Sequence, residues 1–94
     1  MEISFDPAKN AANTETRGLA FELVAAFDFE TAFFKVDDRR DYGEVRIRAL
    51  GLLEGRVHAL VFVETAKGIR VISFRKANQR EVKLYEQETQ PDPD

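Results

Sequence analysis

Residues 71–86 read VISFRKANQREVKLYE, and this stretch decides how the fold ends. Its first four residues, VISF, favour a buried strand, because β-branched and aromatic side chains pack well in sheets. The residues from position 77 onward favour a short helix. The cations that follow the strand are Arg75, Lys76, Arg80 and Lys83. A core strand that ends in cations predicts a position where an anion is held, either a phosphate or the acidic side chains of a partner protein.

The chain before this stretch predicts one short strand, two helices and further strands joined by tight turns. Asp6 suits the N-cap of the first helix, and Pro7 suits its first turn because proline lacks the N–H that would be unpaired there. Gly18 suits the end of that helix. The expected helices span residues 7–17, 20–27 and 77–86, and the expected strands span residues 2–5, 30–36, 45–53, 57–64 and 69–75.

This order, β-α-α-β-β-β-β-α, predicts an α+β fold. The sheet should be mainly antiparallel, because strands joined by tight hairpins run in opposite directions. We expect the helices to cover one face of the sheet and to leave the other face partly open. On the last strand we expect Ile72 and Phe74 to lie under the helices, and Ser73 and Arg75 to face the open side.

The composition fits a globular protein of 94 residues, with 44% hydrophobic and 33% charged residues. The absence of cysteine excludes disulfides, zinc–thiolate sites and a cysteine nucleophile, and it is compatible with a reducing cytoplasm. The N-terminus lacks the apolar run of a signal peptide, and no stretch reaches the ~20 apolar residues that span a membrane. We expect one domain over residues 1–88 and a flexible acidic tail over residues 89–94.

Charge is segregated along the chain, although the net charge is only −3. Residues 1–38 carry three Lys or Arg against eight Asp or Glu, whereas residues 39–83 carry eleven against five. Residues 84–94 carry four acids and no base. Because electrostatic fields act within about 10 Å, the basic middle predicts an anionic partner. The alternatives are cations that solvate an exposed sheet, or a homo-oligomer in which acidic ends meet basic faces.

Three stretches resemble the BrnT family, small ribonuclease toxins of bacterial type II toxin–antitoxin operons with a RelE-like fold. They are ISFDPAKNAAN (3–13), DDRRDYGEVR (37–46) and IRVISFRKANQREVKLYE (69–86). The last is similar to the family's closing motif, a strand of the Ile-Ile-Ser-x-Arg type followed by Arg/Lys-Ala-Asn/Thr, two variable positions and Glu. The resemblance covers about residues 3–86. It implies a toxin that cleaves RNA without a metal ion and thereby inhibits translation.

The resemblance also implies partners. The family's antitoxin resembles a ribbon-helix-helix DNA-binding protein, so we expect a cognate antitoxin of this type to neutralise the chain and to make any contact with DNA. A toxin homodimer within the complex fits the family. After the first helix the family usually has Lys-His-Gly, whereas this chain has Thr16-Arg17-Gly18. This difference supports an alternative, a catalytically weak or inactive member of the same fold that binds antitoxin or RNA.

Metal-free cleavage of RNA by its own 2′-hydroxyl requires proton transfer and stabilisation of extra charge on the phosphate. Arg75 and either Arg39 or Arg40 can hold a phosphate with bidentate donors. A structural ion pair of Arg75 with Glu44 or Glu81 is the alternative. The candidate catalytic residues are Arg75, Glu44, Arg39, Arg17 and Tyr85, and the candidate RNA-binding residues are Arg40, Lys76, Arg80 and Arg46.

Proton transfer has fewer candidates. Glu44 begins the strand after the Arg-rich turn and is the candidate base, with an ion pair to Arg39 or Arg46 as the alternative. Arg17 is expected to hold a phosphate but not to transfer protons, because a guanidinium stays charged at neutral pH. Tyr85 is expected to pack against the sheet, either with its hydroxyl near the site or as a core residue only.

No metal ion or other cofactor is expected. The acids of the turn at residues 37–41 share it with two arginines, which repel a cation. His58 is the only histidine and lies on a mostly apolar strand, where a packed position fits better than a catalytic one. Ser73 has no His–Asp arrangement that would make it a nucleophile.

Overall fold

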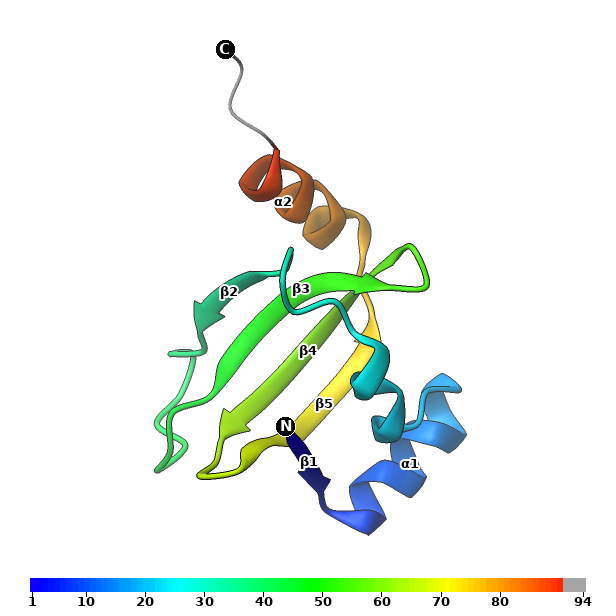
Figure 1. Ribbon diagram of the computed structural model, residues 1–94, viewed down its shortest axis with the longest axis vertical. Helices are drawn as coiled ribbons and strands as arrows, with labels where there is room; N and C mark the ends of the chain where they lie inside the picture. The colour runs from blue at the N-terminus through cyan, green and yellow to red at the C-terminus, as the bar shows by residue number, and fades with distance from the viewer. Residues whose placement is uncertain (91–94) are drawn as a thin grey trace.

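The computed structural model describes residues 1–90 and confirms an α+β fold (Figure 1). The helices are α1 (Pro7–Arg17), the 3-10 helix η1 (Phe21–Ala26) and α2 (Gln79–Thr89). The strands are β1 (Glu2–Phe5), β2 (Phe33–Val36), β3 (Ile47–Leu53), β4 (Arg56–Glu64) and β5 (Gly68–Lys76). Helix α2 extends to Thr89, the first residue of the expected tail, and residues 91–94 of that tail lie outside the described residues.

Within residues 1–90 the strands form one five-stranded sheet in the order β1-β5-β4-β3-β2. The sheet is mainly antiparallel, as predicted, and only β1 pairs in parallel, with β5. The β3–β4 hairpin turns on Glu54 and Gly55, whose φ angles of 51° and 77° suit a two-residue turn that matches the twist of the strands. β4 is the central strand, as its apolar sequence predicts.

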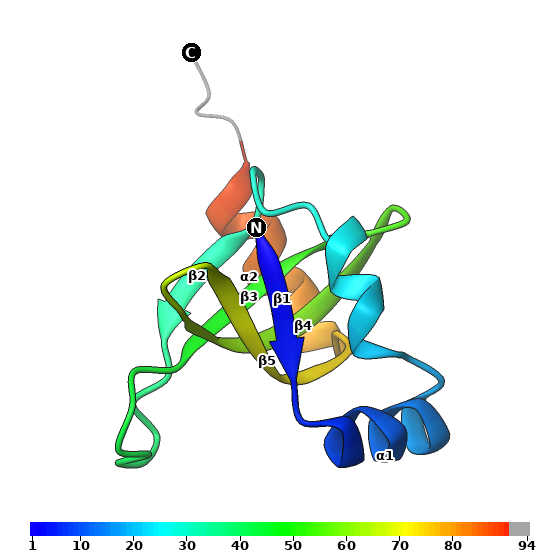
Figure 2. The same cartoon turned by 60° about the horizontal axis from the view of Figure 1, so that its bottom comes forward.

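The prediction that the helices cover one face of the sheet is wrong, because they pack on both faces (Figure 2). On one face, Phe21 and Val24 of η1 are fully buried in a core cluster that includes Leu60. On the other face, Tyr85 of α2 packs in a second cluster with Leu50. The reason is the sequence of β3 and β4, whose side chains are apolar on both faces and therefore need cover on both.

A β-bulge in β5 changes which side chains reach the core. Ile72 is an extra residue opposite the step from Val61 to Phe62, and so it has no partner in the register. Phe74 is fully buried, as predicted. Ile72, however, is only half-buried and lies outside both core clusters, which corrects the prediction that it lies under the helices.

The ends of the elements mostly follow local signals. Asp6 caps α1 through its side chain, and Gly18 ends the helix with a φ of 67°, both as predicted. Asn78 caps α2, so this helix begins at Gln79 rather than at residue 77. β2 and β3 begin three and two residues later than predicted, because the turn closed by Asp28 and the ion-paired loop before β3 take up the first positions.

Helix α1 is held by two asparagines rather than by apolar contacts, since none of its residues is buried. Asn13 Nδ2 donates to the backbone carbonyls of Leu19 and Phe74, at 2.8 Å each. Asn10 Oδ1 accepts the amide of Phe21, the first residue of η1, at 2.8 Å. Directional hydrogen bonds to η1 and β5 therefore fix the helix, and with it the position of Arg17 at its end.

Candidate functional site

A cavity of about 320 Å³ lies on the face of the sheet that carries α2. Its floor is formed by two rows of paired residues that run across the sheet from β2 to β5. The two rows are neighbours on this face of the sheet. One row contains Lys35, Arg48, Val61 and Ser73, and the next row contains Phe33, Leu50, Ala59 and Arg75. Residues two positions apart on a strand point to the same face, so both rows line the cavity. The floor is therefore apolar in its centre, with cations at its margins.

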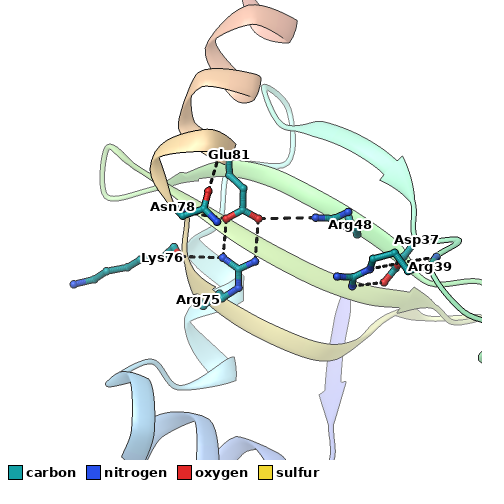
Figure 3. A network of polar contacts seen from close by, with 7 residues as sticks. All are labelled: Asp37, Arg39, Arg48, Arg75, Lys76, Asn78 and Glu81. Atoms are coloured by element: carbon teal, nitrogen blue, oxygen red, sulfur yellow. Dashed lines mark hydrogen bonds and ion pairs between the residues drawn. The ribbon is translucent and has the colours of Figure 1, made fainter.

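Arg75 forms a bidentate ion pair with Glu81 at one side of the cavity (Figure 3). Arg75 Nη1 donates to Glu81 Oε1 at 2.7 Å, and Nη2 donates to Oε2 at 2.9 Å. Glu81 also accepts the backbone amide of Asn78 at 3.0 Å, which completes a capping box at the start of α2. These hydrogen bonds lower the pKa of Glu81 and raise the pKa of Arg75, so both stay charged at neutral pH. The start of α2 thus fixes the direction of the Arg75 guanidinium.

Arg39 forms a second bidentate ion pair, with Asp37, across the cavity from Arg75 (Figure 3). Arg39 Nε donates to Asp37 Oδ1 at 2.8 Å, and Nη2 donates to Oδ2 at 2.7 Å. The Asp37 side chain is only 1% exposed, whereas that of Arg39 is 58% exposed. Hydrogen bonds from Arg39 hold the pKa of Asp37 far below its usual range. A buried carboxylate therefore positions an exposed guanidinium at the rim.

The remaining cations of the lining are Arg48, Lys35 and Arg17. Arg48 Nη2 lies 3.9 Å from Glu81 Oε2, which is an ion pair without a direct hydrogen bond. Among residues 1–90, neither Lys35 nor Arg17 forms an ion pair with a carboxylate. Among the described residues, the cavity lining contains five cationic side chains and one carboxylate, that of Glu81. The electrostatic potential of the cavity therefore favours an anion.

Comparison with protein families identifies the family of this chain. Residues 5–81 match the family described as ribonuclease toxin, BrnT, of type II toxin–antitoxin system. The chain belongs to this family. No curated protein matches the chain. Within residues 1–90, no helix has the length and hydrophobicity needed to cross a membrane.

The structure brings three of the predicted catalytic residues of this BrnT family member into the cavity: Arg75, Arg39 and Arg17. Arg17 stands at the position where the family usually has His, so this exchange falls inside the cavity. It leaves the lining without a histidine. The family difference therefore concerns a residue of the cavity lining and not a remote surface.

Glu44, the predicted base, does not line the cavity. It forms one ion pair with Arg70 of β5 at 2.6 Å and another with Arg46, in the loop before β3, at 3.0 Å. Hydrogen bonds from Arg70 and Arg46 lower the pKa of Glu44. The alternative of an ion pair between Glu44 and Arg46 is confirmed. Of the two alternative partners of Arg75, Glu81 forms the ion pair and Glu44 does not.

Tyr85, also predicted as catalytic, is 9% exposed and packs in the core cluster under α2. It does not line the cavity, so the structure supports its packing role. The predicted RNA-binding residues Arg40, Lys76 and Arg80 are exposed and also lie outside the lining. Arg46 lines a second hollow elsewhere on the sheet.

His58 is a packed residue, as expected from its apolar surroundings in the sequence. It is 4% exposed, and its ring lies 5.4 Å from that of Phe74, in the core on the η1 side. Its Nδ1 lies 2.8 Å from the carbonyl oxygen of Arg56. The histidine is therefore separated from the cavity by the sheet.

Three charged residues of the cavity lining were not predicted as part of the site: Arg48, Lys35 and Glu81. Glu81 had a signal in the sequence, since Asn78 followed three residues later by Glu is typical of a capping box, and a capping box fixes the carboxylate near the end of β5. Arg48 alternates with the predicted Arg46 along the strand expected at residues 45–53. Lys35 had no such signal, because its position beside Arg48 depends on the register between β2 and β3.

Proposed function

We propose that this chain is a metal-independent endoribonuclease with a RelE-like fold, which cleaves RNA and inhibits translation. The cavity supports this function most directly, since Arg75, Arg39 and Arg48 face one space of about 320 Å³ with Arg17 and Lys35 beside them. Guanidinium groups match the oxygens of a phosphate diester with paired donors. Membership of the BrnT family supports RNA as the source of that phosphate.

In this mechanism the scissile phosphate lies between Arg75 and Arg39. The 2′-hydroxyl oxygen attacks the phosphorus, and its proton leaves. The 5′-oxygen of the next nucleotide departs with a proton, and the other product ends in a 2′,3′-cyclic phosphate. Negative charge on the phosphate increases in the transition state, where guanidiniums held in advance by Glu81 and Asp37 stabilise it without reorganisation.

The cavity provides fewer groups for proton transfer than for charge stabilisation. The guanidiniums keep their protons at neutral pH, and the lowered pKa of Glu81 makes this carboxylate a weak base. We therefore expect stabilisation of the phosphate charge to supply most of the acceleration, with water exchanging the protons.

The proposed function includes neutralisation by a cognate antitoxin of the ribbon-helix-helix type. Acidic side chains of such an antitoxin fit the cationic cavity and would exclude RNA from it. Contact with DNA is then made by the antitoxin, and two toxin copies meet within the complex. The net positive charge of the cavity lining supports this mode of inhibition.

The test uses the purified chain and bulk RNA in EDTA. The unmodified chain should cleave, and Arg75→Ala should lower the rate by about 100-fold or more, as expected for the loss of a group that stabilises transition-state charge. Arg48→Ala, whose partner Glu81 keeps its bidentate contact with Arg75, should lower it as well. The matched control is Arg56→Ala, which removes an exposed arginine outside the cavity.

A Thr16→Lys/Arg17→His variant tests the family difference at the same time. Cleavage by the unmodified chain that disappears only in the cavity variants supports the proposed enzyme. Cleavage only by the Lys-His variant contradicts activity of the natural chain and leaves it as a binding protein. Equal rates for Arg75→Ala and Arg56→Ala would contradict the cavity as the site of cleavage.

A further inference from the structure

A second, more open hollow lies beside β1 and the start of α1. Its lining consists of Ser4, Phe5, Asp6, Lys9, Arg46, Arg70, Val71 and Ile72. Arg70 pairs in the sheet with Val63, which lies two residues after Val61 of the cavity floor. Arg46 lies two residues before Arg48. Since alternate residues share a face, both arginines lie on the cavity side of the sheet, about 7 Å further along the strands.

Glu44 holds these two arginines side by side. Arg46 donates through Nε to Oε2 at 3.0 Å, and Arg70 donates through Nη2 to Oε1 at 2.6 Å. Each arginine thus uses a single N–H on the shared carboxylate, whereas Arg75 and Arg39 use two on theirs. Two cations that share one carboxylate keep a net positive charge and further donors for an anion.

A chain of contacts links this pair of arginines to the cavity. The guanidinium of Arg46 lies over the ring of Tyr42, 4.2 Å from its centroid. The Tyr42 hydroxyl donates to Asp37 Oδ2 at 3.2 Å, and Asp37 holds Arg39 at the cavity rim. The two groups of cations are therefore fixed relative to each other, on one continuous face.

We propose, on the basis of the ribonuclease function above, that Arg46 and Arg70, with Lys9 beside them, form a second phosphate site for the same RNA strand. An RNA that is cut internally carries a phosphate on each side of the scissile one, so its neighbours must lie over the adjoining surface. A basic surface that follows a backbone is typical of proteins that bind single strands. The second site takes a neighbouring phosphate and adds affinity without taking part in bond cleavage.

The test measures binding of single-stranded RNA that carries 2′-O-methyl groups and so has no nucleophile. The short oligonucleotide is a dinucleotide, whose single phosphate occupies the cavity, and the long one has about 12 nucleotides, within the range of single-strand site sizes. Arg46→Gln/Arg70→Gln should weaken binding of the long RNA about 10-fold and leave the short RNA nearly unchanged. The salt dependence of long-RNA binding should become shallower by about 0.7 in log–log slope, the value for one lost phosphate contact on a single strand.

The control is Arg56→Gln/Lys67→Gln, which removes two exposed cations outside both hollows. Glu44→Gln should change the affinity for long RNA in the opposite direction. It removes the carboxylate that Arg46 and Arg70 share, so long RNA should bind more tightly. It also keeps the test decisive if the double variant fails to fold. Equal losses for the double variant and the control would overturn the second site, as would equal losses on short and long RNA.

Cleavage by the unmodified chain, measured in parallel, separates the two proposals. Cleavage with no effect of Arg46 and Arg70 on binding overturns the second site and leaves the ribonuclease function intact. Length-dependent binding without cleavage supports the second site and contradicts the ribonuclease function. Binding of polyglutamate, an acidic polypeptide, is measured with the same variants. If Arg46→Gln/Arg70→Gln loses polyglutamate binding but keeps RNA binding, the second site is overturned and the surface is assigned to an acidic protein partner.

Discussion

At the scale of the residue, the candidate site depends on two carboxylates that do not face solvent. Asp37 and Glu81 are both buried, and each makes two hydrogen bonds to the guanidinium of one arginine. Such a carboxylate either orients the arginine for a phosphate or competes with the phosphate for its donors. Because Glu81 also closes the capping box of α2, its position is set by the helix and not by Arg75 alone.

We predict that Glu81→Gln lowers the rate constant for RNA cleavage on the order of 10–100-fold with a smaller change in KM, because a misdirected guanidinium stabilises the transition state poorly. The amide retains an oxygen that can accept the Asn78 amide, so α2 should still form. Single-turnover kinetics on a defined RNA would measure the effect.

Two variants separate positioning from helix stability. Asn78→Ala removes the cap side chain but leaves the Arg75–Glu81 pair, so it should lower thermal stability more than cleavage. Glu86→Gln, an exposed site on the same helix, should change neither. Faster cleavage by Glu81→Gln would show that the carboxylate competes with the phosphate.

At the scale of the element, α1 is the unusual part of the fold. It carries Arg17 into the cavity, yet it contributes no buried residue to either core cluster. Its alanines at positions 8, 11 and 12 are exposed, and its contact side is formed by Asn10 and Asn13. The amide of Asn13 bonds to the carbonyl of Phe74, the residue before Arg75, which joins α1 to the end of β5.

We predict that Asn13→Ala lowers the free energy of unfolding by about 1–3 kcal/mol, because two part-buried carbonyls lose their donor. Thr14→Ala is the control, since the Thr14 hydroxyl bonds only to the Asn10 carbonyl of the same helix. Denaturant unfolding measures both. Equal stability of the two variants would contradict the role of Asn13 as the anchor of α1.

At the scale of the whole molecule, ion-paired carboxylates make stability depend on pH. The carboxylates with lowered pKa values include Asp37, Glu44 and Glu81. A carboxylate whose pKa is lower in the folded state stabilises the fold above the pKa of the unfolded chain, 3.8 for Asp37. This contribution is lost as the pH falls from there toward the folded-state pKa. The molecule should therefore lose stability in acid.

We predict that Asp37→Asn lowers Tm at neutral pH, and that its deficit relative to the unmodified chain narrows on acidification to about pH 3. The narrowing follows because Asp37 becomes protonated in the unfolded chain at a higher pH than in the fold, whereas the amide does not titrate. Asp38→Asn, its exposed neighbour, is the control. Thermal unfolding followed by circular dichroism measures Tm, and a deficit that stays constant with pH would argue against Asp37 as the titrating group.

The order of elements and their caps could be predicted from the sequence, because they depend on neighbours along the chain. Asp6, Pro7 and Gly18 act through local hydrogen bonds and backbone angles, and the apolar runs of β4 and β5 predict central, buried strands. The position of Arg75 at the end of β5, next to a helix start, is local in the same sense. The position of Arg75 was therefore enough to predict a cationic site at the end of this strand.

Only the tertiary structure decided which charges meet. The register of β2 on β3 places Lys35 beside Arg48, and the bulge at Ile72 turns Ser73 and Arg75 toward the cavity. Glu44 was the expected base, but the long loop before β3 directs it to Arg46 and Arg70. Pairing partners in a sheet lie far apart in sequence, and a single extra residue reverses the faces of a strand. The sequence by itself therefore determined the elements and the sign of the site's charge, whereas strand register and helix packing decided its members.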